Sequence, residues 1–296
     1  MALPTSDTIV TYPDGATSST GTVLHVEPLG DERSAILLDT TAFHPVDSAW
    51  PDQPADRGTL TTARGAAPIV DAVTGGIHDG RLHLGPDLPV RTGTEGWVFV
   101  VAHVIEGPPP AIGESVQIDV DQSFRAALSA AHTACHLAAL ALDAALASAW
   151  TKDAPTDALG SPAFDSLAIQ SSRISPYRST DTYRIGKSLR RKGFTPAALA
   201  DPAAVAQRVN AVLAPWIAAG GSVRIERGEN TLSARRTWVC ELPDGLTDIP
   251  CGGTHLRDLG GLASVTTSLA TREIDGGLEL VMETVATAQH GASATR

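Results

Sequence analysis

Short runs in which hydrophobic, β-forming residues alternate with polar ones or cluster together fill the first third of the chain, a pattern typical of β-strands. Such runs stand at Gly21–Val26, Ser34–Asp39 and Gly96–Val101. Gly, Pro and Asp residues separate them, as in a small barrel or sandwich. Three consecutive prolines, Pro108–Pro110, then break the pattern and form a stiff spacer. We therefore expect a β-barrel-like domain over residues 1–107 and a second domain over residues 108–296.

The second domain mixes helical and strand patterns. Its clearest helix covers residues 119–150, where alanine and leucine recur at helical spacing and Asp119 or Asp121 can cap the first turn. A further helix is predicted over residues 201–219, and a glycine pair ends it. Residues 151–172 have the composition of an irregular loop. Strands are expected over residues 222–227, 237–242, 263–269 and 277–283.

The composition is that of an ordinary globular protein, with 43% hydrophobic and 19% charged residues. The chain contains no apolar run long enough to span a membrane, and its N-terminus lacks the pattern of a secretory signal, so we expect no membrane partner. Three cysteines cannot all pair with one another, which favours a reducing cytoplasm and a metal or free-thiol role. Cys135 and Cys240 are expected to pack in the interior.

The net charge of −11 is unevenly distributed. Residues 1–120 hold 16 acidic and 5 basic side chains, whereas the remainder holds 17 of each. Within that remainder, Arg173–Lys192 carries seven basic residues and one acidic residue, Asp181. Such a basic segment can attract phosphates, and from charge alone it is equally consistent with a solvated surface.

Two pairs of metal-capable side chains, each with a spacing of four, carry the most chemical information. His132 and His136 share one face of the predicted helix. Cys251 and His255 flank a glycine-rich turn that can bend tightly around an ion. Either pair alone is a weak signal, because histidine and cysteine are common in protein interiors. Together they offer three imidazoles and one thiolate, which are donors that suit Zn²⁺, so we expect a zinc site.

These motifs resemble those of the alanyl-tRNA editing proteins, free-standing relatives of the editing domain of alanyl-tRNA synthetase. Threonyl-tRNA synthetase editing domains are similar at the same two motifs. The resemblance is closest over Ile249–Leu256, and it extends to the helix with both histidines and to Arg125 ahead of them. In the front part it includes Leu38–Phe43 and Gln53–Gly58. Most of the chain is therefore covered, although the matching residues are concentrated in short motifs.

The resemblance implies an α+β fold, with a small N-terminal β-barrel followed by an editing domain of helices packed on an antiparallel sheet. It also implies an activity: hydrolysis of mischarged aminoacyl-tRNA in trans, typically Ser-tRNA(Ala). The zinc ligands that it implies are His132, His136, Cys251 and His255.

No nucleophile motif such as Gly-x-Ser-x-Gly occurs, so we expect a water molecule on the zinc ion to attack the ester. Backbone amides around Gly253 and Thr254 are candidates for stabilising the oxyanion. Thr254 and Thr133 are also candidates for binding a substrate hydroxyl. The residues expected to contact tRNA phosphates are Arg184, Lys187, Arg190, Arg191 and Lys192.

Two other functions stay open. One is a zinc-dependent hydrolase of a small ester, thioester or amide that has no tRNA partner. The acidic front part favours it, as does the loop His44–Asp52, which lacks the glycine triplet usual in the family. The other is a binding protein that uses zinc only for folding, because four protein ligands are also typical of a closed structural site.

Overall fold

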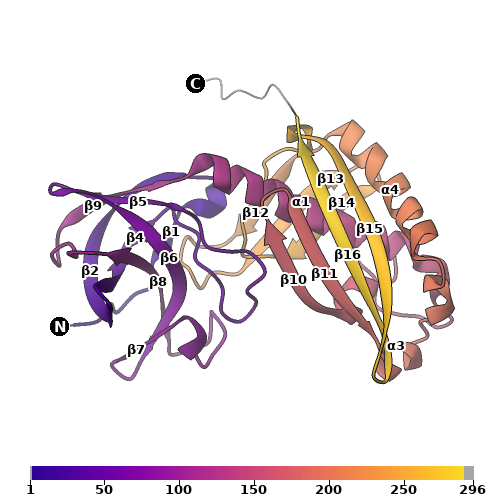
Figure 1. Ribbon diagram of the computed structural model, residues 1–296, viewed down its shortest axis with the longest axis horizontal. Helices are drawn as coiled ribbons and strands as arrows, with labels where there is room; N and C mark the ends of the chain where they lie inside the picture. Colours follow the sequence, from indigo (N-terminus) through magenta and orange to yellow (C-terminus); the bar gives the residue numbers. More distant parts are fainter. Residues whose placement is uncertain (1, 290–296) are drawn as a thin grey trace. The chain divides into compact units, whose positions relative to one another are not determined.

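The computed structural model describes residues 2–289. Its backbone contacts divide the chain into two compact units, both discontinuous in sequence (Figure 1). The first unit comprises Met1–Ala126, Ile225–Thr237 and Pro250–Thr254, and the second comprises the rest. The division into a domain over residues 1–107 and another over residues 108–296 stays a prediction. Strand β9 (Ser115–Val120), which lies beyond that residue, pairs with β2 and β5 in the sheet of the first unit.

Antiparallel strands dominate the first unit. Within the described residues, seven of them form a sheet in the order β5-β9-β2-β3-β8-β6-β7, and β5 also pairs with β6. The sheet agrees with the β-rich N-terminal part expected from the sequence, and its description as a small barrel stays a prediction. Its strands other than β9 are β2 (Ser18–Gly30), β3 (Arg33–Leu38), β5 (Gly58–Thr62), β6 (Gly65–His78), β7 (Arg81–Leu84) and β8 (Val98–Glu106). Two short strands, β1 (Ile9–Val10) and β4 (Thr40–Thr41), pair in parallel beside it.

Local sequence explains the hairpins and the core of this sheet. The β2–β3 turn places Asp31 and Glu32 at positive φ, as a two-residue hairpin turn requires. Alternate side chains then point to the interior, where Ile36, Leu60 and Ile118 are almost completely buried. Strand β3 is buried on both faces, so its apolar residues are consecutive in the sequence, whereas those of β9 alternate with more exposed residues.

The second unit combines helices with two smaller sheets, so the chain as a whole mixes α and β structure and is rich in sheets. Its helices are α1 (Gln122–Ala145), α2 (Phe164–Ala168), α3 (Lys187–Arg191) and α4 (Pro202–Ala219). Antiparallel strands β10 (Ile169–Ser175), β11 (Arg178–Ile185), β16 (Gly277–Ala288) and β15 (Leu262–Ile274) form one sheet in that order. Strands β12 (Val223–Arg227), β13 (Arg236–Leu242) and β14 (Gly245–Pro250) form the other, of which residues 225–227, 236–237 and 250 are assigned to the first unit.

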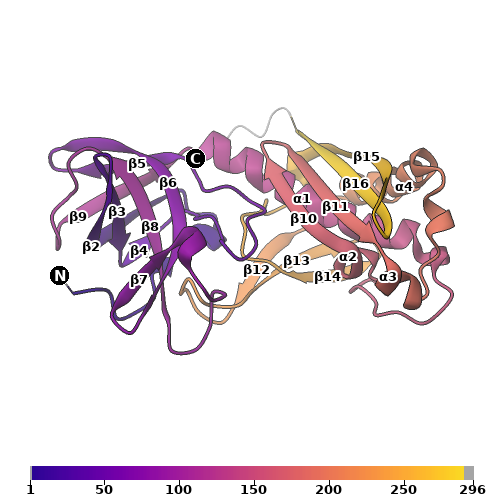
Figure 2. The same ribbon diagram turned by 60° about the horizontal axis from the view of Figure 1, so that its bottom comes forward.

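Helix α1 lies between the four-stranded sheet and strands β13 and β14 (Figure 2). Asp121 caps its start, accepting hydrogen bonds from the backbone N–H groups of Ser123 and Phe124. Nearly every residue from Ala127 to Asp143 is buried, which is expected of a helix covered on more than one side. Its many alanines allow the neighbouring strands to approach closely.

The irregular loop predicted over residues 151–172 is only partly correct. Helix α2 and the first residues of β10 fall inside it, and β10 pairs with β11 along its length. Much of the basic segment Arg173–Lys192 is therefore a β-hairpin followed by α3. In the part of the chain that the structure describes, no helix has the length and apolarity needed to cross a bilayer.

Candidate metal centre

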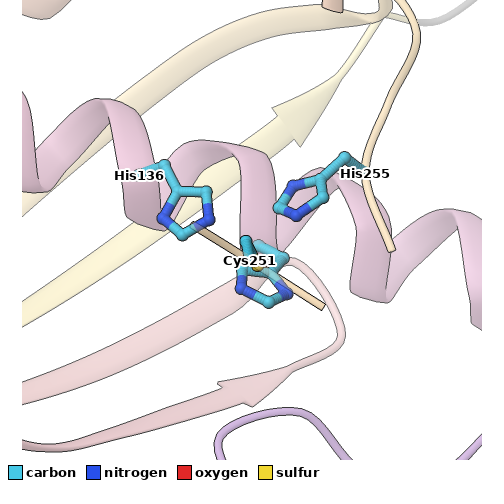
Figure 3. A group of neighbouring side chains, drawn as sticks. His136, Cys251 and His255 are labelled. Carbon is cyan, nitrogen blue, oxygen red and sulfur yellow. The ribbon is translucent and has the colours of Figure 1, made fainter. Parts of the chain in front are cut away.

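The four side chains predicted to bind metal lie together. His132 and His136 project from one face of α1, since residues four apart are neighbours on a helix. Cys251 directly follows β14, and His255 comes four residues later. The potential ligand atoms of all four lie within 4.8 Å of one another. In Figure 3, His136, Cys251 and His255 gather around a common space beside the helix.

Ring packing holds the imidazoles in place. The ring centroid of His255 lies 4.4 Å from that of His132 and 5.0 Å from that of His136. The indole of Trp238, on β13, lies 5.1 Å from the His136 ring and is completely buried. Trp238 therefore forms an apolar wall of the site, which restricts the rotamers of the neighbouring rings.

Burial favours the neutral form of the His136 imidazole, as metal binding requires, and also that of the Cys251 thiol, which must lose its proton to bind a metal ion. Burial lowers the pKa of His136 to about 4 and raises the pKa of the Cys251 thiol to about 12. Nε2 of His136 is buried and has no hydrogen-bond partner among the described residues. A buried polar atom without a partner is unfavourable, and a metal ion would use its lone pair. Three imidazoles with one ionisable thiol match the donor preference of Zn²⁺.

Thr133 orients His255 from the helix. Its hydroxyl oxygen accepts a hydrogen bond of 3.1 Å from the backbone N–H of Leu256 and lies 3.4 Å from Nδ1 of His255. A contact at Nδ1 restrains the ring and leaves Nε2 as the nitrogen available to a metal ion. The predicted role of Thr133 in binding a substrate hydroxyl stays a prediction, since its oxygen already contacts these two groups.

Hydrogen bonds also define the turn that carries Cys251. The Cys251 N–H donates to the carbonyl oxygen of Arg236 at 3.1 Å, and the Gly253 N–H lies 3.4 Å from the Cys251 sulfur. The Thr254 N–H donates to Oε1 of Gln53 at 3.0 Å. The oxyanion role predicted for Gly253 and Thr254 would require both amides to leave these acceptors.

The basic residues predicted to bind tRNA lie on β11, α3 and the residue after it. Arg184 and Arg190 donate to the carbonyl oxygens of Asp275 and Gly276, respectively, in the β15–β16 turn. The other three side chains are exposed and, within residues 2–289, form neither hydrogen bonds nor ion pairs. These are Lys187, Arg191 and Lys192.

Sequence reasoning did not assign a role to the loop between β4 and β5. Gln53 and Asp56 of this loop are almost completely buried. Asp56 forms an ion pair with Arg125, whose Nε lies 2.6 Å from Oδ1. The matching motifs indicated that this loop and Arg125 were of interest, but only the structure shows what they contact.

Comparison with known proteins finds that the chain is similar to part of the alanyl-tRNA synthetases. It is 30% identical over 258 residues to an alanine–tRNA ligase of Pyrobaculum neutrophilum, which covers 84% of this chain and 24% of the ligase. It is 32% identical over 102 residues to that of Caldivirga maquilingensis, over 34% of this chain and 9% of the ligase. No family model matches the chain.

The chain is therefore related to alanyl-tRNA synthetases, as the motifs around the two ligand pairs indicated. It spans at most about a quarter of the length of these curated relatives. The relationship thus concerns one portion of a larger ligase. The metal-capable group is a property of this chain itself.

Proposed function

We propose that the protein is a zinc-dependent aminoacyl-tRNA deacylase that acts in trans on mischarged tRNA(Ala), with Ser-tRNA(Ala) as its substrate. One observation carries the proposal: both ligand pairs converge into a single group of three imidazoles and one thiol. The relationship to alanine–tRNA ligases supplies the substrate class. The proposal requires no nucleophilic side chain, because an aminoacyl ester is already activated.

The site would work as follows. His132, His136, Cys251 and His255 would hold a Zn²⁺ ion, which would supply Lewis acidity for polarising an ester carbonyl and lowering the pKa of water. Thr133 keeps the His255 ring in its orientation through the contact at Nδ1. The Gly253 N–H points at the Cys251 sulfur and stabilises its thiolate form.

The buried indole of Trp238 closes one side of the imidazole group. A low-polarity wall of this kind strengthens electrostatic interactions at the reacting ester. No residue of the described chain is assigned as general base. Hydrolysis breaks the bond between the acyl carbon and the ribose oxygen: one proton of water ends on the ribose hydroxyl of the tRNA product, and the released carboxyl group loses its proton to solvent.

Lys187, Arg191 and Lys192 are the proposed phosphate contacts. Their charges are exposed and are not engaged with the rest of the described chain. Arg184 and Arg190 have a second role, because they bind carbonyl groups of the β15–β16 turn. Phosphate contacts of this type position a nucleic acid without reading its sequence.

Deacylation assays test the proposal. Ser-tRNA(Ala), Gly-tRNA(Ala) and correctly charged Ala-tRNA(Ala) are incubated separately with wild type and His136→Ala. Fast hydrolysis of a mischarged species by wild type alone, with Ala-tRNA(Ala) spared, is the expected result. Hydrolysis of none of the three by a zinc-loaded wild type would instead favour a hydrolase of small esters, thioesters or amides.

A further inference from the structure

The segment between Cys251 and His255 is anchored by a residue 201 positions away in sequence. The side-chain amide of Gln53 makes two hydrogen bonds to Thr254, which directly precedes His255. Gln53 Oε1 accepts from the Thr254 N–H at 3.0 Å, and Gln53 Nε2 donates to the Thr254 hydroxyl at 2.9 Å. A backbone N–H can only donate, so the amide orientation of Gln53 is fixed by this contact.

The surroundings of Gln53 are also polar and buried. Nε2 of Gln53 lies 3.5 Å from Nδ1 of His44. Burial lowers the pKa of His44 to about 4, so this ring is neutral and its Nδ1 can accept the contact. Gln53 and Thr254 are 1% and 3% exposed, so water does not compete for these hydrogen bonds.

The loop that carries Gln53 is fastened at its base. The His44 N–H donates to Oδ2 of Asp56, and the Asp56 N–H donates to the carbonyl oxygen of His44. Asp56 is paired with Arg125, and Arg125 also donates to the carbonyl oxygen of Ala42 at 2.8 Å. Both ends of the loop are therefore held in place, and this positions the Gln53 side chain for its contact with Thr254.

We propose that Gln53 is a positioning residue for the metal centre: through Thr254 it holds the turn on which the ligands Cys251 and His255 stand. The inference rests on the metal site of the proposed function. It states that metal affinity also depends on Gln53, a residue that is not itself a metal ligand. Groups that orient metal ligands typically change affinity by ~10–100-fold when removed.

Zinc affinity of the purified full-length protein tests this inference, by competition with a chromophoric chelator. Gln53→Met keeps the size of the side chain and removes both hydrogen bonds to Thr254. It should weaken zinc binding by ~10–100-fold. Thr254→Val removes only the hydroxyl contact and should have a smaller effect. The double variant should bind no more weakly than Gln53→Met, since the two residues act through the same contact.

Gln117→Met is the matched control. Gln117 accepts a hydrogen bond of 2.9 Å from the hydroxyl of Thr20 on the surface of the same unit, so this substitution also breaks an amide–threonine pair. Zinc affinity should be unchanged. The thermal stability of each metal-free variant is measured in parallel, because a merely structural role would lower stability and leave zinc affinity intact.

The spectrum of the Co²⁺-loaded protein provides a second measurement. If the Cys251 turn loses its position, the cobalt–thiolate absorption of Gln53→Met should change in energy or intensity, whereas that of Gln117→Met should match wild type. Wild-type zinc affinity in a folded Gln53→Met protein would overturn the inference. If Gln53→Met does not fold, an unchanged affinity in Thr254→Val would do so. A wild type that binds zinc but hydrolyses no aminoacyl-tRNA would remove the proposed function and leave this inference standing.

Discussion

Arg125 and Asp56 form a buried ion pair between the start of α1 and the loop that holds Gln53. The Nε of Arg125 lies 2.6 Å from Oδ1 of Asp56, and the two side chains are 6% and 0% exposed. Removal of one partner would leave a buried charge without compensation. The ion pair therefore contributes to the stability of the first unit and also holds the loop in its position.

Arg125→Met should destabilise the protein by about 3–5 kcal/mol, the usual cost of breaking a buried ion pair. Urea denaturation monitored by circular dichroism measures the change. Arg272→Met provides the comparison, because Arg272 pairs with Glu279 at 2.6 Å but is 72% exposed. That variant should lose less than about 1 kcal/mol. Equal losses of unfolding free energy in the two variants would contradict the stabilising role of the buried Arg125–Asp56 ion pair.

A second prediction concerns Asp143 of α1, whose Oδ1 accepts a hydrogen bond of 2.7 Å from the N–H of Asp165. Burial raises the pKa of Asp143 to about 9. The folded protein therefore keeps a proton that the unfolded chain releases near pH ~4. The contribution of Asp143 to stability is complete below that pH and is lost as the pH rises towards 9.

Asp143→Asn should abolish this dependence. Its Tm should exceed that of wild type by a margin that grows from pH 5 to pH 9, and ~1 kcal/mol corresponds to a measurable ~2–4 °C at this size. Differential scanning calorimetry at several pH values gives the comparison. The exposed Asp153 offers a control, since Asp153→Asn should leave the wild-type profile unchanged. If the Tm of Asp143→Asn differs from that of wild type by the same amount at every pH, Asp143 is not a buried protonated carboxyl.

Metal binding should stabilise the chain through Cys251. Addition of a chelator should lower the Tm of wild type, because a ligand that binds only the folded state contributes ~4 kcal/mol at a thousandfold excess over its Kd. Cys251→Ala should show no such difference and should lose the metal on dialysis. Cys240→Ala should retain the metal, since Cys240 is a buried residue of β13 outside the ligand group. Complete unfolding of wild type on chelation would indicate a structural metal.

Charge reversal should separate tRNA binding from metal binding. The triple variant Lys187→Glu, Arg191→Glu and Lys192→Glu should weaken tRNA binding and flatten its dependence on salt, with a slope change of roughly 0.7–0.9 for each lost phosphate contact. Zinc content should not change. Filter binding at several salt concentrations measures the effect.

A matched triple variant at exposed arginines of the first unit, Arg33→Glu, Arg81→Glu and Arg91→Glu, changes the net charge equally. It should retain the salt slope of wild type. If both triple variants weaken tRNA binding alike, the effect reports overall charge, and the assignment to α3 and its neighbours is wrong.

Local sequence predicted the elements with strong periodicity. The alanine- and leucine-rich run with Asp121 as its cap is α1, and the i, i+4 rule placed His132 and His136 on one face. Strand β10 was missed, because Ile169–Ser175 is rich in serine and is stabilised by pairing with β11. Tertiary pairing overrode its weak local preference.

The metal-capable group could be proposed from two motifs and a resemblance, but its supporting contacts could not. Gln53 and Thr254 are 201 residues apart, and nothing in either local sequence indicates that they touch. Trp238 stands in an ordinary strand pattern, and only the fold places its ring against His136. Contacts between residues so far apart in the sequence depend on the tertiary fold, which the periodicity of local sequence does not determine.

The most direct test of zinc-dependent deacylation is a zinc titration of the metal-free protein, followed by the initial rate of Ser-tRNA(Ala) hydrolysis. The metal-free protein should have almost no activity, and the rate should rise to a plateau at one equivalent of zinc. His136→Ala should stay inactive over the same range. Full activity of the metal-free protein, or no activity of wild type with one zinc ion bound, would contradict zinc-dependent deacylation.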